Sequence, residues 1–522
     1  LRCSDSVSAL QSFRILRCIR QMSPTAQLRL QRRASPGCEK RHGLMRPAFS
    51  AAGPAAAALA LLTLTACAST REVDTRLPAA YEAPVGQAGV VALDTWWTSF
   101  GDAQLTGLIE QALAASPDAR TAAARLREAR ATRAGAFNTF LPQGNLVGSS
   151  TRTESEVIEG TELNIPGVSS SGASQRDALD FDVSWEIDLF GRIFAARRAA
   201  NAEMAAARLD YEATRASLAA NVADSYFAAR GLAIQLADAR ETVRIQTELA
   251  RITGVRAQRG IGPASDADRV AGDLAQAQSQ VTGLQAQLQA AQRSLLILVG
   301  RGIEPTASLP LEPVVGAVPA VPASIPGELL ARRPDVRQAE ALLRSALGRG
   351  DYARLAFFPT VRLAPGIGLT RVDQPGYSAT TQAWSIGANV TVPVLNIPQL
   401  LTDLRVQNAR TEQAAIAYER AVQTAFGEAE NGLVQLAADR RRIELLRDGE
   451  VRARRAFEAS RLGYQNGLTD IQTLLSSEQA WRAIRTQYTA AQVQGLRRAV
   501  TTYKALGGGW PAQDLPTNRE AR

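Results

Sequence analysis

The chain has 522 residues, a net charge of +9 and a sequence pI of about 9.8, which at first suggests a negatively charged partner such as nucleic acid. The distribution of the charge excludes that class, because residues 1–66 hold ten of the 59 Lys and Arg residues and only two of the 50 Asp and Glu residues. Subtraction leaves 49 basic and 48 acidic residues after position 66. The rest of the chain is almost neutral, and we expect no nucleic-acid partner.

Residue types that carry most enzymatic and metal chemistry are scarce. The single histidine is His42, and the two lysines, Lys40 and Lys504, follow no glycine-rich phosphate-binding loop. Histidine catalysis, histidine metal sites and a Walker-type nucleotide site are therefore excluded after residue 66. Paired carboxylates could still hydrolyse glycosides, but acids at i, i+2 on one strand more often face solvent or a pore. We expect no enzyme, no metal and no cofactor.

The front of the chain predicts a secretion signal. Residues 1–44 hold three of the four cysteines and no clear periodicity. We expect them not to belong to the native protein, which would begin at Met45; a basic disordered leader is the alternative. From Met45, one arginine precedes an apolar run that ends in small residues, the order of a signal peptide over residues 45–66. The run is too short and interrupted for a spanning helix.

The signal ends in a sequence that resembles a bacterial lipobox, Leu64-Thr65-Ala66-Cys67. In lipoproteins of that class, the cysteine is acylated and the signal is cut before it, and several acyl chains give a stable anchor. The resemblance implies lipid on Cys67, which would be the only cysteine left after cleavage. Ala68 follows the cysteine, and the absence of an aspartate there favours the outer membrane.

The rest of the chain contains an internal duplication. Residues 116–142 and 333–359 align at an offset of 217, which pairs Pro117 with Pro334 and Pro142 with Pro359. Further on, at an offset of 207, Gly260 aligns with Gly467 and Gly300 with Gly507. Ser116 is a plausible N-cap, with Pro117 at the first helical position. Each copy therefore predicts the same order of elements: a helix, two strands and a pair of long helices.

The long helices are predicted by the absence of breakers. Residues 192–258 contain no proline and only two glycines, and predict about 100 Å of helix at about 1.5 Å per residue. After a break at 259–265, apolar residues at steps of three and four predict a heptad seam that packs on the preceding helix. The seam residues are Ala267, Val270, Leu274, Ala277, Val281, Leu284, Leu288, Ala291, Leu295 and Leu298. The second copy repeats this with 398–466, a break at 464–470 and a return helix to Leu506.

Strands are predicted at about 145–153, 180–189, 361–369 and 384–394, the first of them weakly. The second is the clearest, because DFDVSWEIDLFGR (180–192) alternates large apolar with polar residues. An enzyme cleft, a solvated sheet and a lipid-facing sheet remain open for it. Residues 68–104 are expected to be extended and mixed, and residues 301–326, with six prolines, to be a connector.

The chain resembles outer-membrane efflux channels of the TolC type, in particular the NodT-like lipoproteins that serve resistance-nodulation-division pumps. Four motifs in order carry the resemblance: Trp96-Trp97 with Phe100, SWEIDLFGR (184–192), RRPDVRQAE (332–340) and YKALGGGW (503–510). It implies a mixed, mainly helical fold in which a trimer forms one β-barrel with four strands per chain, continuing into a periplasmic helical barrel. The residues alone imply that several chains assemble, since open strand edges do not exist in hydrocarbon.

The resemblance also implies roles for residues. On the strand at 180–189, the lipid-facing side chains would be Phe181, Val183, Trp185, Ile187 and Leu189. The lumen-facing side chains would be Asp182, Ser184, Glu186 and Asp188. The helix breaks would be the periplasmic tips, where acids narrow the pore and glycine turns meet an adaptor. The gate or adaptor tip would comprise Asp268, Gly260, Gly262, Gly467, Thr469 and Asp470, although Asp268 is equally explained as an acid near a helix N-terminus.

The implied function is passive conduction of drugs or other small solutes, with a periplasmic adaptor, an inner-membrane pump and outer-membrane lipid as partners. The alternatives are a type I secretion channel and a lipid-anchored periplasmic coiled-coil scaffold without a pore. The expected segments are a lipidated N-terminal segment (67–104), a first efflux repeat (105–300), a proline-rich connector (301–326), a second repeat (327–507) and a tail (508–522).

Overall fold

The structure, a computed structural model, describes residues 75–83, 93–156, 158–159, 172–321 and 326–510. The chain divides into two units, Leu1–Thr70 and Arg71–Arg522, and the described residues belong to the second. The expected signal peptide, the cysteine expected to carry lipid (Cys67) and most of the expected tail lie outside them.

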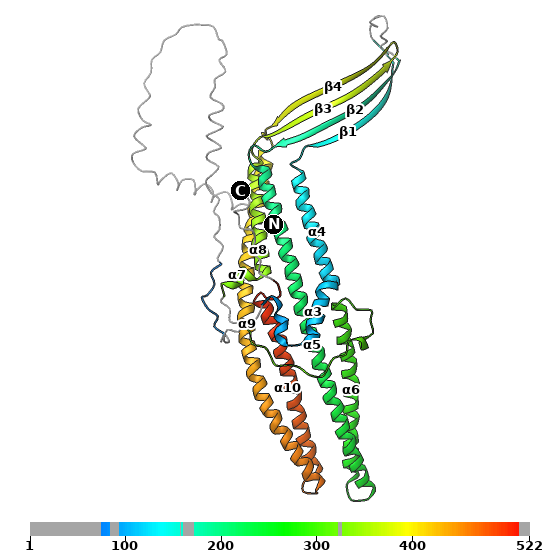
Figure 1. The fold of residues 1–522 in the computed structure, drawn as a ribbon, viewed down its shortest axis with the longest axis vertical. Helices are drawn as coiled ribbons and strands as arrows, with labels where there is room; N and C mark the ends of the chain where they lie inside the picture. Colours follow the sequence, from blue (N-terminus) through cyan, green and yellow to red (C-terminus); the bar gives the residue numbers. More distant parts are fainter. Residues whose placement is uncertain (1–74, 84–92, 157, 160–171, 322–325, 511–522) are drawn as a thin grey trace, which may run out of the picture. The chain divides into compact units, whose positions relative to one another are not determined.

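The duplication predicted from the sequence is present in the order of elements (Figure 1). The first copy contains α4 (Pro117–Asn138), β1 (Gln143–Ser155), β2 (Gly172–Ile187), α5 (Arg192–Gln258) and α6 (Ala264–Leu298). The second contains α8 (Pro334–Leu355), β3 (Thr360–Gln374), β4 (Tyr377–Thr391), α9 (Ile397–Gln465) and α10 (Ile471–Ala505). Most equivalent boundaries differ by the offsets of 217 and 207 that the sequence gives.

Four shorter elements complete the described fold. They are η4 (Leu93–Phe100), α3 (Ala103–Ala115), which comes before α4, η5 (Thr306–Ser308) in the connector, and α7 (Glu328–Arg332), which comes before α8. The expectation of an extended segment over 68–104 is wrong in its last part, because Leu93–Phe100 forms 3-10 helix around buried Trp96 and Trp97. Burial of these two indoles stabilises a helical conformation that the local sequence does not signal.

The long helices form two antiparallel pairs, which we call the first helical pair (α5 and α6) and the second helical pair (α9 and α10). All ten seam positions predicted for α6 are buried or half-buried against α5. Within the described residues, no helix is both long and apolar enough to cross a membrane.

Small residues set the spacing between the helices. Near the sheet, neighbouring helices contact in the order α4, α5, α8, α9; nearer the tips, α10 contacts both α5 and α9. A Cβ added to Gly348 of α8 would lie 2.9 Å from the backbone nitrogen of Ala199 in α5. A Cβ at Gly231 of α5 would lie 2.8 Å from Val493 Cγ2 in α10. At both positions, a side chain larger than that of glycine would clash with the neighbouring helix unless the helices moved apart.

The main apolar core lies where α3, α5, α10 and the ends of the connector meet. Trp96, Tyr226 and Tyr503 are fully buried there. The rings of Trp96 and Tyr503 stack with centroids 5.7 Å apart. This cluster fixes the two copies to each other through side chains that come from both ends of the described chain.

The four strands form one antiparallel sheet in the order β1-β2-β3-β4. The weak first strand forms because β2 covers its glycines: a Cβ on Gly144 would lie 3.0 Å from Phe181 Cζ. The strands of the second copy are longer than predicted, since β3 continues to Gln374 and β4 begins at Tyr377. In contrast, β2 ends at Ile187, two residues before the predicted end at Leu189.

Candidate functional site

The sheet has one apolar and one polar face. Successive side chains on a strand point to opposite faces, and paired residues share a face. The register therefore places Phe181 on the same face as Leu146, Ile367 and Trp384. The other large apolar residues of this face are Leu179, Val183, Trp185, Ile187, Val361, Leu363, Leu369, Ile386 and Val390. Trp384 and Ile386 are 78% and 72% exposed, so within the described chain nothing covers this face.

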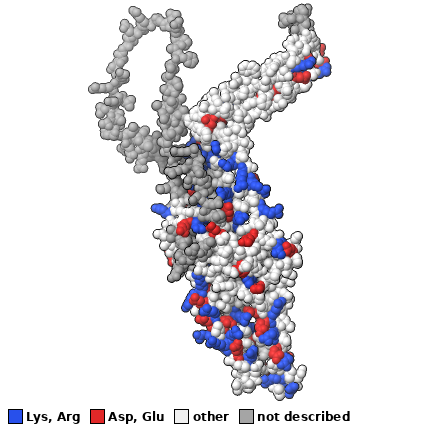
Figure 2. All heavy atoms as spheres, viewed as in Figure 1, with Lys and Arg blue, Asp and Glu red and all other residues white. Residues whose placement is uncertain are grey.

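The apolar face has a limited length. On β2 it extends from Leu179 to Ile187, and the next residue of the same face is Asp177, opposite Arg371 of β3. About nine to eleven residues of a tilted strand cross the hydrocarbon core of a membrane, and residues 179–187 match that length. Figure 2 shows few charged side chains along the middle of the visible sheet, whereas charges of both signs gather over the helices.

The opposite face is lined mainly by polar side chains and glycines, with Val147, Ala178 and Val372 among its apolar members. Asp182 and Ser184 lie on it, together with Asp180 and Glu186 of the same strand. Asp180 lies opposite Gly368, and Asp182 lies opposite Gly366, where a Cβ would be 2.9 Å from Asp182 Oδ1. Glycines on β3 thus leave room for the carboxylates of β2 on this face.

Three residues predicted to lie on the faces of β2, Glu186, Asp188 and Leu189, lie at or beyond the joint between β2 and α5. Glu186 forms ion pairs with Arg192, at the start of α5, and with Arg362 of β3, whose Nη2 lies 3.3 Å away. Its carboxylate is therefore neutralised by two guanidinium groups. Asp188 and Leu189 follow the end of the strand at Ile187, so the strand register does not assign them to either face. The backbone N–H of Phe194 donates to Asp188 Oδ2 (3.1 Å), which satisfies a free donor in the first turn of α5.

Trp185 lies at the same end of the apolar face. Its Nε1–H donates to the carbonyl of Phe140 (3.0 Å), in the segment that leads from α4 into β1. The indole is 40% exposed. An apolar ring whose single polar group is bonded suits the boundary between lipid and water.

The turns that end the long helices, residues 259–263 and 466–470, are called the helical tips here. Gly260 and Gly467, predicted as equivalents, both adopt left-handed backbone, with φ of +70° and +74°. A residue with a Cβ disfavours that conformation, which explains the glycine at each position. Gly262 follows in the first tip, where a Cβ would approach Arg256 Cβ to 3.3 Å.

The polar residues of the tips have local partners. Asp470 is the N-cap of α10: its Oδ1 accepts from the backbone N–H of Thr473 (2.6 Å), and this bond lowers the pKa of its carboxyl. Thr469 donates through Oγ1 to the carbonyl of Ser460 (3.2 Å). Asp268 is exposed in the second turn of α6, while Asp266 occupies the first. Asp268 is therefore not the acid next to the helix N-terminus.

The two tips are joined by a second apolar cluster. It contains Leu249, Val270, Phe457, Tyr464, Leu474, Leu475 and Trp481. The guanidinium of Arg256 lies over the ring of Tyr464, 5.6 Å from its centroid, and Arg269 Nη1 donates to Gln472 Oε1 (2.8 Å). The helical pairs are thus in direct contact close to the tips.

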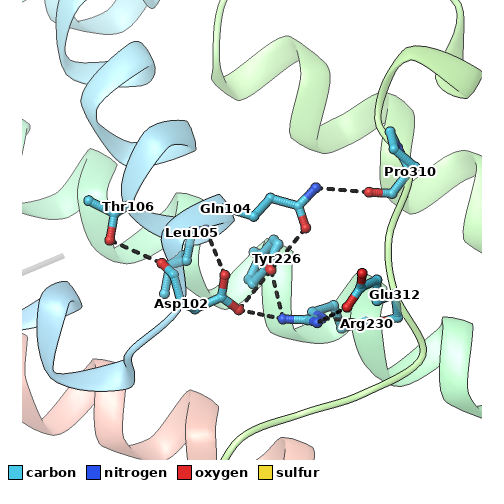
Figure 3. A network of polar contacts seen from close by, with 8 residues as sticks. All are labelled: Asp102, Gln104, Leu105, Thr106, Tyr226, Arg230, Pro310 and Glu312. Carbon is cyan, nitrogen blue, oxygen red and sulfur yellow. Dashed lines mark hydrogen bonds and ion pairs between the residues drawn. The ribbon is translucent and has the colours of Figure 1, made fainter.

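A buried polar network fastens the connector to α5 (Figure 3). Asp102 forms an ion pair with Arg230 and accepts a hydrogen bond from the Tyr226 hydroxyl (2.8 Å). Arg230 Nε also donates to the carbonyl of Glu312 (3.2 Å), and Gln104 Nε2 donates to that of Pro310 (2.8 Å). Burial and the neighbouring Asp102 carboxylate raise the pKa of Tyr226, which stays a neutral donor.

Sequence reasoning missed this network and a buried acid, Glu478 of α10. A signal for Glu478 was present: it falls between Leu474 and Trp481, at the spacing of one apolar helix face. An acid in that position is either a break in the stripe or a buried group with a partner. Asp102 and Arg230 are 128 residues apart, so no local pattern could join them.

A two-faced sheet continuous with duplicated pairs of long helices defines a class, the channels that pass through the outer membrane into the periplasm. The family model described as "Outer membrane efflux protein" matches the chain twice, at residues 108–301 and 325–508. The chain belongs to this family. It is an efflux channel of the outer membrane and periplasm and not an enzyme, which confirms the function, location and TolC-type resemblance predicted from the sequence.

Curated relatives cover most of the chain. "Pyoverdine export outer membrane protein OpmQ" of Pseudomonas putida is 30% identical over 456 residues, which are 84% of this chain and 93% of the relative. "Toluene efflux pump outer membrane protein TtgC", also of Pseudomonas putida, is 28% identical over 448 residues, 84% of this chain and 90% of the relative. The solved outer-membrane channel OprN superposes with a TM-score of 0.73 at 28% identity, covering 85% of this chain and all of OprN.

Proposed function

We propose that three copies of this chain close their sheets into one barrel that conducts drugs or other small solutes out of the cell. The observation that supports this most directly is the sheet itself. Its order leaves one edge of β1 and one edge of β4 without a paired strand among the described residues. In hydrocarbon, each backbone N–H and C=O needs a partner, and edges of neighbouring copies supply it. The number three comes from the resemblance to TolC-type channels.

In this barrel the apolar face contacts lipid and the polar face lines the pore. Phe181, Val183, Trp185 and Ile187 then lie against lipid, and Asp182 and Ser184 face water. Glu186 contributes little charge to the lumen because two arginines pair with it. Asp188 and Leu189 belong to the joint with α5.

The tips form the periplasmic end of the channel and meet a periplasmic adaptor, which joins it to an inner-membrane pump of the resistance-nodulation-division type. The left-handed turns at Gly260 and Gly467 present two similar ends per chain, as binding of a repeated adaptor surface requires. Thr469 and Asp470 close one turn through local bonds, and Asp268 is free to face the pore or an adaptor.

Acylation of Cys67 adds a membrane anchor to the barrel. The apolar run before it and the small residues at the cut site support this step. Labelling cells with radioactive palmitate tests it: wild-type chain should be labelled and the Cys67→Ser variant should not. Equal labelling of both would refute the anchor.

The exported solute is tested by deletion and complementation. Loss of the chain should raise the susceptibility of its host to several unrelated toxic compounds or block export of a secreted metabolite, and the wild-type gene should restore both. The names of the relatives include pyoverdine export and toluene efflux, so siderophores and solvents belong in the panel. A deletion that changes no susceptibility and no secreted compound would contradict the export function.

Assembly is tested separately. Light scattering of the purified chain in detergent, corrected for bound detergent, should give the mass of three chains. A monomer or a dimer would contradict the closed barrel, whatever the solute.

A further inference from the structure

Three polar contacts along the helices join α5 of the first helical pair to α10 of the second. Asp224 accepts two hydrogen bonds from Arg497, at 2.7 and 2.9 Å. Asp238 forms an ion pair with Arg485 at 2.6 Å. The third contact, nearest the tips, joins Gln246 and Glu478 at 2.7 Å. In the first two contacts, the carboxyl group faces a guanidinium group of the other helix. In the third, the carboxyl group of Glu478 faces the neutral amide of Gln246.

The third contact is also the most deeply buried. Glu478 is 0% exposed and Gln246 is 1% exposed. Only one hydrogen bond joins them, from Gln246 Nε2 to Glu478 Oε2. Gln246 Oε1 and Glu478 Oε1 are both buried without a hydrogen-bond partner. Two acceptor oxygens without a donor are costly inside a protein.

The charged groups around Glu478 do not supply a hydrogen-bond donor for these two oxygens. Arg482 Nε forms an ion pair with Glu478 Oε1 at 3.5 Å but no hydrogen bond, and because both residues lie on α10 this pair joins no two elements. From α6, Asp273 adds a negative charge. On the α9 side, Glu450 accepts a hydrogen bond from Trp481 Nε1 (2.9 Å). No described arginine of α5, α6 or α9 forms an ion pair with Glu478.

A proton on Glu478 would supply the missing donor. The neutral acid offers one O–H and one acceptor, and a primary amide offers the complementary pair, so the two groups can form two hydrogen bonds. The ionised acid offers acceptors alone. We propose that Glu478 is a proton-binding site whose occupancy controls how tightly the two helical pairs hold together near the tips: protonation locks α10 onto α5, and ionisation loosens the contact.

The direction of the pH effect follows from the environment. Burial is the largest influence and raises the pKa of Glu478 above its ordinary value of 4.5. The charge of Arg482 opposes this rise, the charge of Asp273 adds to it, and the hydrogen bond from Gln246 opposes it least. The folded state therefore binds the proton more tightly than the unfolded state. Its stabilising contribution is complete below about pH 4.5 and is lost as the pH rises through the raised pKa of the folded chain.

The test is hydrogen exchange of the full chain in detergent, followed over peptides that cover residues 471–485 and corrected for the chemical exchange rate. Between about pH 5 and about pH 8, protection of these amides should fall about tenfold in the wild type. In Glu478→Gln it should stay constant, because an amide pair needs no proton. Glu458→Gln is the matched control: Glu458 is half-exposed and pairs with Arg454 on α9, and its variant should behave like the wild type.

The proposal is overturned if Glu478→Gln shows the same fall in protection as the wild type. If that variant does not fold, carboxyl infrared spectra of the wild type decide: a protonated buried carboxyl must be lost over the same pH range as the protection, and its absence overturns the proposal. The proton site does not depend on the proposed channel function. A chain that shows the exchange effect but forms no pore would refute that function and leave the proton site intact.

Discussion

At the scale of residues, the structure depends on a few buried polar groups that connect distant parts of the chain. In the network of Asp102, Tyr226 and Arg230, Asp102 contacts both α5 side chains, and those two side chains also bond to each other. The side chains of Asp102 and Arg230 are 16% and 11% exposed. Loss of one member therefore leaves a charge that water reaches poorly.

Replacing Asp102 with alanine should destabilise the chain by about 2–4 kcal/mol, because among the described residues the Arg230 charge then keeps only the exposed Glu312 as an ion-pair partner. The measurement is chemical denaturation followed by circular dichroism. Glu312→Ala is the control: this side chain is 84% exposed and 3.9 Å from Arg230, so its removal should change little. Equal losses in the two variants would contradict the assigned role of Asp102.

Cysteine substitution tests the two faces of β2. If Cys67 is acylated as proposed, it is blocked, and Ser184→Cys should react with a charged, water-soluble thiol reagent that reduces conductance. Its neighbour Val183→Cys, on the apolar face, should be protected by lipid and leave conductance unchanged. The pair differs by one position and in side-chain direction. Similar labelling at both sites would show that the faces are assigned wrongly.

The sequence predicted which side chains of β2 share a face, but not the contacts that each side chain makes. Alternation identified Asp182, Ser184 and Glu186 as one set, and the register confirms that they share a face. It could not show that Glu186 is ion-paired or that Asp188 lies beyond the strand. Both facts depend on Arg192 and Phe194, which fold onto the strand end only when α5 begins.

At the scale of elements, helix boundaries were predicted well because breakers mark them. Prolines begin α4 and α8, and left-handed glycines follow α5 and α9. Strand ends were predicted poorly. The outer parts of β3 and β4 contain Arg371, Thr380 and Thr381, polar residues that do not alternate with large apolar ones and so give no alternation signal for a strand.

Helix spacing gives a test at this scale. Gly348→Ala should destabilise the chain by about 1–3 kcal/mol, because the new methyl group meets backbone atoms of Ala199 that cannot rotate away. Gly107→Ala, in α3 with nothing within 4 Å of the added Cβ, should stabilise it by up to about 1 kcal/mol. Thermal unfolding measured by circular dichroism compares them. A stabilising Gly348→Ala would contradict the close packing of α5 and α8.

At the scale of the whole molecule, one chain is incomplete. The apolar face of the sheet is exposed, and both of its edge strands lack a neighbour among the described residues. Such a surface is stable only in lipid and only when its edges are paired. The sequence alone predicted the need for assembly, because two separated β-hairpins cannot close a barrel, but it could not predict how many copies assemble.

Conductance of the purified full-length chain in a planar lipid bilayer tests the central claim most directly. We expect discrete, stable conductance steps from the assembled protein, reduced when the thiol reagent modifies Ser184→Cys and unaffected when the reagent is applied to Val183→Cys. A chain that inserts into the bilayer and gives no conductance steps under any applied voltage or pH would contradict the assignment of a channel.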